Sequence, residues 1–248
     1  MTRRIALLIL LFATGTLAAC GSSSSKPAAA PPATSPPSSS LAPTTALPSG
    51  KLVGLFKITP GSCARATVSG SYFRMVQSGG SVTAGPYVPN ADSPCADKTY
   101  TALAPGTDGG LLTGSYQPEP SPPFDGSHNG TADRITLPAK FFAVGFALAT
   151  NQTDPQTSSA APPPSVTASP TGTLTGDLSA LGVAWNGQQF NQGAPKPNGA
   201  ASPNTTGPTG TYDATTGAYV LQWTSQISGG PFNGFTGVWH LEGDFSAR

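Results

Sequence analysis

Glycine and proline interrupt this sequence so often that they restrict its fold more than any other feature. Of the 248 residues, 30 are Gly and 27 are Pro, about twice the usual share. In a helix interior, Gly costs about 1 kcal/mol and Pro about 3 kcal/mol relative to Ala. After the first twenty residues, no window of eleven has the apolar spacing of an amphipathic helix without one of them. The pattern excludes long helices and coiled coils and favours short β-strands between turns.

Strand signals are frequent, because short β-branched and aromatic runs lie between Gly, Pro, Asn and Asp. We expect about eleven strands, at 52–58, 71–77, 99–103, 111–116, 134–137, 141–150, 172–178, 183–190, 209–212, 218–227 and 235–245. The apolar run 139–149 is predicted as one buried central strand, bent at Gly145. This pattern is typical of an all-β fold, a sandwich or irregular barrel of antiparallel strands. Low-complexity loops are predicted near 151–172 and 191–210.

The C-terminal region, 209–245, is predicted as a three-stranded meander. Apolar and polar residues alternate along its last two strands. Matching their apolar faces sets Trp223 opposite Trp239 and Gln222 opposite His240, because a slip of one residue would invert one strand. We expect both Trp side chains in the core.

The polar face of this meander carries a possible ligand or metal site. His240, Glu242 and Asp244 alternate along one strand and project from one face, with Gln222 on the neighbouring strand. One imidazole and two carboxylates suit Ca²⁺, Mn²⁺ or Zn²⁺, or a polar ligand. Alternatively, these side chains lie on a solvated outer face of the sheet.

Three aromatic residues form a second possible binding site. Trp185 precedes an Asn-Gly turn, and Phe232 and Phe235 flank the Gly-rich tip 229–234. Aromatic side chains exposed at loop tips can bind sugars or lipids, because they provide large apolar contact areas. Alternatively, Phe232 folds back to cover one end of the sandwich.

Catalytic and cofactor signals are weak. The chain has no Gly-x-Ser-x-Gly, P-loop, dinucleotide-binding or His-Glu-x-x-His motif. Asp125, Ser127 and His128 share a turn-like loop, but neighbours in one loop rarely reach triad geometry. A glycosidase needs two carboxylates, and the only glutamates are Glu119 and Glu242. We therefore predict no catalytic residues and no cofactor. The 12 Lys and Arg residues are spread too thinly for a nucleic-acid partner.

The N-terminus has the features of an export signal. Two arginines precede an apolar run at 5–13, which is too short to span a bilayer. The sequence Leu-Ala-Ala-Cys at 17–20 then resembles the lipobox of bacterial lipoproteins. This resemblance implies a signal peptide at 1–19, acylation of Cys20 (by palmitate, for example) and a lipid anchor on the extracytoplasmic face of the cell membrane. The composition of the remaining chain resembles exported actinobacterial lipoproteins, including mycobacterial ones.

Cleavage would leave a lipidated Ser/Pro/Ala-rich tether at 20–50 and a single all-β domain at 51–248. The cleaved chain would carry 10 basic and 11 acidic side chains, so the lipid and not charge would attach it to the membrane. Two cysteines remain in this exported chain, and Cys63 and Cys95 are predicted to form a disulfide. Closing the loop between these two cysteines adds at most about 4 kcal/mol to the free energy of unfolding.

Three functions fit these features. The first is a domain that binds an envelope lipid, glycan or protein without catalysis. The second is a purely structural or interaction lipoprotein, and the third is a secreted-type hydrolase assembled from distant residues. An apolar cavity would favour the first and a solid sandwich the second. Convergence of His240, Glu242 or Asp244 with His128 or Asp125 in a cleft would favour the third.

The lipid anchor predicts the mass of the native protein. After detergent extraction, we expect an intact mass above that of residues 20–248 by the mass of the acyl chains. Intact-mass spectrometry measures this difference, and an unmodified Cys20 would contradict the lipoprotein interpretation.

Overall fold

The computed structural model describes residues 50–248, apart from 65–66 and 201. These residues form seventeen strands and no helix, and every strand pair is antiparallel, which confirms the all-β prediction. Among these residues, therefore, no helix is available to cross a membrane. The predicted signal peptide, Cys20 and nearly all of the tether lie outside the described residues.

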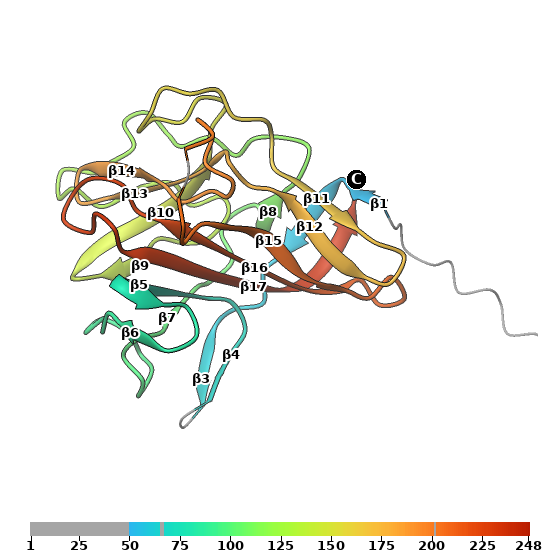
Figure 1. The fold of residues 1–248 in the computed structure, drawn as a ribbon, viewed down its shortest axis with the longest axis horizontal. Helices are drawn as coiled ribbons and strands as arrows, with labels where there is room; N and C mark the ends of the chain where they lie inside the picture. The colour runs from blue at the N-terminus through green and yellow to red at the C-terminus, as the bar shows by residue number, and fades with distance from the viewer. Residues whose placement is uncertain (1–49, 65–66, 201) are drawn as a thin grey trace, which may run out of the picture. The chain divides into compact units, whose positions relative to one another are not determined.

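The strands form three sheets (Figure 1). The main path of the large, curled sheet runs β1 (Gly50–Leu52), β11 (Ser165–Ala168), β12 (Thr173–Asp177), β15 (Thr206–Tyr212), β16 (Ala218–Gln226), β17 (Thr236–Ala247), β2 (Gly54–Lys57) and β8 (Gly110–Leu112). Off this path, β5 (Tyr72–Ser81) pairs with β17, β6 (Gly85–Tyr87) and β7 (Thr101–Ala102). The second sheet has the order β14 (Gln188–Asn191), β13 (Leu181–Trp185), β10 (Val144–Thr150) and β9 (Ala139–Phe141). The third is the hairpin of β3 (Ser62–Ala64) and β4 (Thr67–Ser69).

Strand β17 connects the parts of the large sheet. One edge pairs with the whole of β16, from Ala218 opposite Asp244 to Gln226 opposite Thr236. The other edge pairs first with β5 and then, near its end, with β2. Both edges are therefore hydrogen-bonded, and β5 and β2 are aligned by one strand.

The predicted register of the last two strands is confirmed. Trp223 lies opposite Trp239 and Gln222 opposite His240. The two indole rings stack with centroids 5.7 Å apart and planes at 8°, and they are 2% and 0% exposed. Both indole N–H groups donate to Gln192, one to its backbone carbonyl at 2.9 Å and one to Oε1 at 3.2 Å. One glutamine thus satisfies two buried donors, which would otherwise cost about 1–3 kcal/mol each.

Aromatic side chains join the large sheet to the four-stranded sheet, which lies beside β5, β16 and β17 in Figure 1. Phe73 on β5 contacts Phe146 on β10 at a centroid distance of 5.5 Å, and Phe141 on β9 at 5.8 Å. Phe146 also contacts Trp239, with centroids 6.2 Å apart. All four rings belong to one buried core.

The disulfide prediction is also confirmed. Cys63 on β3 is bonded to Cys95, with their Cα atoms 5.2 Å apart, a usual separation for a disulfide. The bond ties the small β3–β4 hairpin to the loop that precedes β7.

Several predicted strand boundaries are wrong. The apolar run 139–149 is not one bent strand but the hairpin of β9 and β10, and 183–190 is the hairpin of β13 and β14. The segment 134–137 forms only a single bridge, between Thr136 and Pro105. Strand β11 lies within the stretch predicted as a loop near 151–172. None of the described residues in 192–205 belongs to a strand, in agreement with the second predicted loop. Position 201 is not described.

Two glycines of β15 provide a test of the close approach between β15 and β16. A Cβ atom added at Gly210 would lie 1.8 Å from the carbonyl oxygen of Val220, whereas one at Gly207 would meet nothing within 4 Å. We expect Gly210→Ala to destabilise the fold by about 2 kcal/mol or more and Gly207→Ala by less than about 0.5 kcal/mol. Urea denaturation measures both, and equal midpoints would show that the two strands can separate freely here.

Candidate functional site

Two hairpin turns of the same type lie at one end of the four-stranded sheet. Asn186 and Gly187 connect β13 to β14, with φ values of 50° and 68°. Phe142 and Ala143 connect β9 to β10, with φ values of 51° and 63°. In both hairpins the residues that flank the turn are paired, so each is a two-residue turn with positive φ at both positions, as in type I′. Strands β10 and β13 are antiparallel neighbours, which puts both turns at one end.

The Phe142–Ala143 turn is strained. Left-handed backbone costs an ordinary L residue about 1–2 kcal/mol, whereas Asn and Gly adopt it readily. The Ala143 N–H donates to the Asp92 carboxylate at 2.6 Å, which helps to hold the turn. Phe142 is nevertheless 46% exposed. The chain thus keeps a costly turn that presents an aromatic ring to solvent, and such strain is concentrated at functional sites.

An aromatic cluster surrounds this turn, consisting of Phe141, Phe142, Trp185, Phe232 and Phe235. Phe232 is its centre, at centroid distances of 5.3 Å from Trp185, 5.6 Å from Phe235, 5.8 Å from Phe141 and 5.9 Å from Phe142. The structure therefore brings together the three aromatic residues singled out in the sequence. Phe232 does fold back over the sheets, and it remains half-buried rather than fully buried.

A cavity of about 40 Å³ lies between the two sheets beneath the aromatic cluster. Its lining includes Phe73 and Met75 from the large sheet, Val183 and Trp185 from the four-stranded sheet, and Phe232. The volume accommodates about three water-sized groups, but an apolar cavity stays dry. Gln192 also lines it, but its polar atoms are bonded to the two indoles and to the Asn191 carbonyl. The cavity therefore suits a small apolar group.

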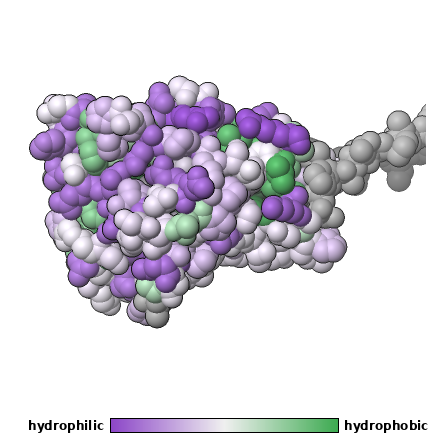
Figure 2. Space-filling view, turned by 90° about the horizontal axis from the view of Figure 1, so that it is seen from above, coloured by the Kyte–Doolittle hydropathy of each residue, from purple (hydrophilic) through white to green (hydrophobic). Residues whose placement is uncertain are grey.

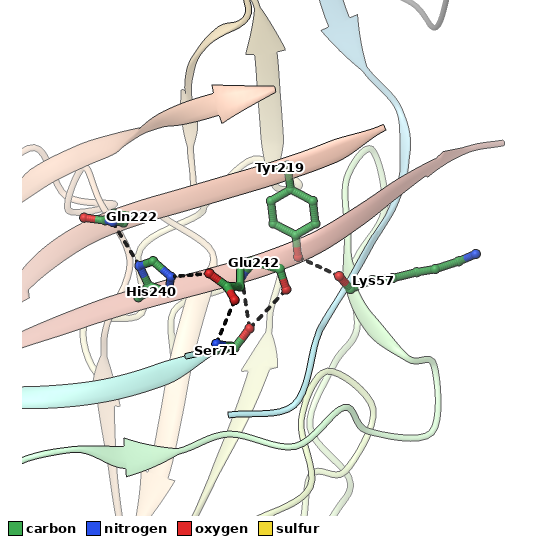
Figure 3. Close-up of polar contacts among 7 residues, drawn as sticks. Lys57, Ser71, Tyr219, Gln222, His240 and Glu242 are labelled. Atoms are coloured by element: carbon green, nitrogen blue, oxygen red, sulfur yellow. Dashed lines mark hydrogen bonds and ion pairs between the residues drawn. The ribbon is translucent and has the colours of Figure 1, made fainter. Parts of the chain in front are cut away.

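The polar face of the meander is closed by its own hydrogen bonds (Figure 3). Gln222 Nε2 lies 2.9 Å from His240 Nδ1, and His240 Nε2 lies 3.1 Å from Glu242 Oε2. Because a side-chain amide nitrogen only donates, Nδ1 accepts and the Nε2–H donates to Glu242. Glu242 Oε1 accepts the Gly70 N–H at 2.7 Å, and the Glu242 N–H donates to Ser71 Oγ at 3.0 Å.

This network argues against a metal site. Both ring nitrogens of His240 are occupied, and Asp244 is exposed and makes no side-chain bond to His240 or Glu242. Within 50–64, 67–200 and 202–248, no three His, Cys, Asp or Glu side chains form a group that could hold a metal ion. Of the two interpretations of this face, the outer sheet surface fits the geometry better, with His240 and Glu242 bonded to the protein rather than fully solvated.

A row of aromatic contacts that the sequence analysis missed extends this polar face across β5. His240 stacks on Tyr72 with centroids 4.6 Å apart, and Tyr72 meets Tyr100 edge-on at 4.9 Å. The Arg74 guanidinium lies 3.4 Å from the Tyr87 ring centroid and 4.1 Å from that of Tyr100. These rings are occupied by one another and by Arg74, so they offer little free ring surface to a sugar.

His128 does not converge with His240. The His128 carbonyl accepts the Gly187 N–H at 3.3 Å, beside the β13–β14 turn, whereas His240 lies on β17. The neighbouring Asp125 carboxylate is bonded to its own loop, through the N–H groups of Ser127 and Asn129. These loop bonds lower the pKa of Asp125, the side chain of Asn129 contributing most. The residues weighed for hydrolysis thus form a self-contained loop.

Exposed apolar surface on this protein is limited. On the face in Figure 2, hydrophobic residues form small separate patches among polar ones. Among the described residues, the exposed large hydrophobic side chains are Val53, Val82, Leu137 and Phe142, and Phe142 alone is aromatic.

Comparisons with protein-family models, curated proteins and solved structures found no match to this chain. Inferences about its site therefore rest on the residues themselves.

Exchanging the turn sequences tests the strain. Replacing Phe142–Ala143 by Asn-Gly removes left-handed strain at two residues and loses aromatic contacts worth about 0.5–1.5 kcal/mol. We expect a net gain in stability of about 1 kcal/mol, measured by urea denaturation. Replacing Asn186–Gly187 by Phe-Ala is the matched control, and it should destabilise the fold. A loss of stability in the first variant would show that the native turn is not strained.

Proposed function

We propose that this chain is a lipid-anchored extracytoplasmic protein whose β domain binds the apolar end of an envelope lipid without catalysis. The observation that carries the proposal is the strained Phe142–Ala143 turn, which exposes an aromatic ring against Phe141 and Phe232, two residues that line an apolar cavity. A turn of Asn and Gly would be more stable there, as in the neighbouring hairpin. The chain keeps Phe142 at a cost in folding stability, which is consistent with a role for this side chain in contacting a ligand.

The membrane attachment rests on the sequence. The lipobox-like residues at 17–20 and the Pro- and Ser-rich segment that follows support a lipid anchor and a tether. Strand β1 begins at Gly50, at the end of the predicted tether. The attachment would keep the cavity close to the lipid surface from which its ligand comes.

Proximity matters because the site is small. A cavity of about 40 Å³ takes about three carbon groups, worth roughly 2–3 kcal/mol of hydrophobic free energy. A Kd of 1 mM already requires about 4 kcal/mol. The aromatic cluster would supply the rest, and anchoring raises the effective concentration of lipid at the site. We therefore expect weak binding of a tethered domain, not tight carriage of a whole lipid.

The other two functions have less support. A purely structural lipoprotein would not need an exposed aromatic ring on a strained turn. The hydrolase interpretation needed His240, Glu242 or Asp244 to converge with His128 or Asp125, but Asp125 is bonded within its own loop and His240 is bonded to Glu242. Among envelope ligands, a glycan would need free ring faces, which the Tyr72–Tyr100–Arg74 contacts occupy.

Titration with decanoic acid below its micellar range tests the proposal. Trp185 and Trp239 line the cavity, so tryptophan fluorescence should change saturably as the chain end enters. Phe142→Ser should weaken binding roughly three- to tenfold, the equivalent of one aromatic contact.

Val53→Ser is the matched control, because Val53 is similarly exposed but lies outside the aromatic cluster. It should bind as the unmodified protein does. No saturable change in the unmodified protein, or equal weakening in both variants, would contradict the apolar-ligand proposal. The lipid anchor is tested separately by the intact mass.

A further inference from the structure

Lys196 carries a half-buried amine that the proposed function does not use. It follows β14 in the segment that leads to β15. Its Nζ donates to the Asn191 carbonyl at 2.9 Å and to Ser225 Oγ at 2.6 Å, and lies 3.5 Å from Asn191 Oδ1. Ser225 is fully buried and donates its own proton to the Gly193 carbonyl at 2.8 Å. The amine is therefore held in one position, against the side chain of Asn191.

Asn191 connects this amine to a buried acid. Its Nδ2 donates to Asp154 Oδ1 at 3.2 Å. Asn191 is 3% exposed and Asp154 1% exposed. The other oxygen of Asp154 accepts the Thr157 N–H at 2.9 Å and the Thr157 hydroxyl at 2.5 Å. A half-buried amine, a buried carboxamide and a buried carboxyl group thus lie in sequence.

We propose that Lys196 and Asn191 form an intramolecular isopeptide bond, with Asp154 as the proton-transfer group. The amide carbon of Asn191 is one bond, about 1.23 Å, from the oxygen that Lys196 Nζ contacts. Asp154 contacts the nitrogen that would leave. The three groups are therefore placed as nucleophile, electrophile and acid–base catalyst.

The reaction is balanced without any further reactant. The neutral amine of Lys196 attacks Cγ of Asn191 and forms the new C–N bond. In the tetrahedral intermediate both nitrogens are bonded to Cγ, so Asp154, which contacts Nδ2, can take a proton from the attacking nitrogen and deliver one to Nδ2. The Cγ–Nδ2 bond then breaks and ammonia leaves, so one amine and one carboxamide become one secondary amide and one ammonia. No oxidation or reduction takes place.

The surroundings favour each step. Burial lowers the pKa of Lys196 to about 8, and the nearby charge of Asp154 opposes this shift. Part of the population therefore carries the neutral, nucleophilic amine near neutral pH. The fixed positions of amine and carboxamide replace a bimolecular encounter, which in well-oriented reactions is equivalent to an effective concentration of up to about 10⁵–10⁸ M.

The bond would stabilise the base of the cavity. It would close a ring across 191–196, which contains Gln192, the residue that accepts from both Trp223 and Trp239. A covalent ring would keep the Gln192 carbonyl and side chain under the two indoles.

Peptide mass spectrometry of the full chain tests the proposal. Chymotrypsin cleavage after Phe190 and Tyr212 releases one peptide that contains both residues. We expect its mass to be one ammonia below that of the sequence, with no backbone fragments from inside 191–196. A peptide of full mass would overturn the proposal, and Lys196 would then be an ammonium held by its acceptors.

Variants separate the bond from a succinimide, which also loses ammonia. Lys196→Arg removes the nucleophile, and the full mass should return, whereas the surface variant Lys140→Arg should keep the loss. Asp154→Asn should slow or abolish the reaction. Persistence of the loss in Lys196→Arg, or its reversal by mild base in the unmodified protein, would overturn the proposal. The mass of the unmodified protein decides the question even if a variant fails to fold.

Discussion

Pairing along both edges of β17 is the interaction on which the rest of the structure depends. The strand aligns β16 on one side and β5 and β2 on the other. Its inward face carries Trp239, which stacks on Trp223 and contacts Phe146 of the second sheet. The position of the four-stranded sheet, and of the cavity between the sheets, follows from this one strand. Its outward face carries His240 and Glu242, so both candidate sites are built on it.

The two faces of β17 differ in how many hydrogen bonds their polar groups already make within the protein. On the outward face, Gln222, His240 and Glu242 bond to one another, and Glu242 also bonds to Gly70 and Ser71, which precede β5. A ligand there would have to break existing bonds. On the inward side, the cavity has apolar walls, and its polar lining residue is bonded to the indoles. An apolar group that enters the cavity therefore breaks few hydrogen bonds and gains contact area with the walls. For this reason we propose ligand binding on this side.

The sequence predicted the features that depend on alternation and failed where a local signal was missing. Alternation favoured the Trp223–Trp239 register, because a slip of one residue would turn one apolar face outward. The β9–β10 turn was missed because Phe-Ala replaces the usual Asn-Gly. Alternation predicted that His240 and Glu242 share a face with Gln222, but not the bonds of Glu242 to Gly70 and Ser71, which lie about 170 positions away. No sequence pattern predicts the contacts among Asp154, Asn191 and Lys196, because these separate polar residues meet only after folding.

The short first strand determines how the domain responds to force. Strand β1 has three residues and pairs only with β11, at the edge of the large sheet. Any tension that reaches Gly50 through the preceding chain is carried first by these three pairs. Only after they separate does the load reach β2, whose residues pair with the end of β17. A pull on the N-terminal segment would thus peel one edge strand before it loads the strand that aligns both sides of the sheet. The edge strand would therefore separate before the strands that line the cavity are loaded.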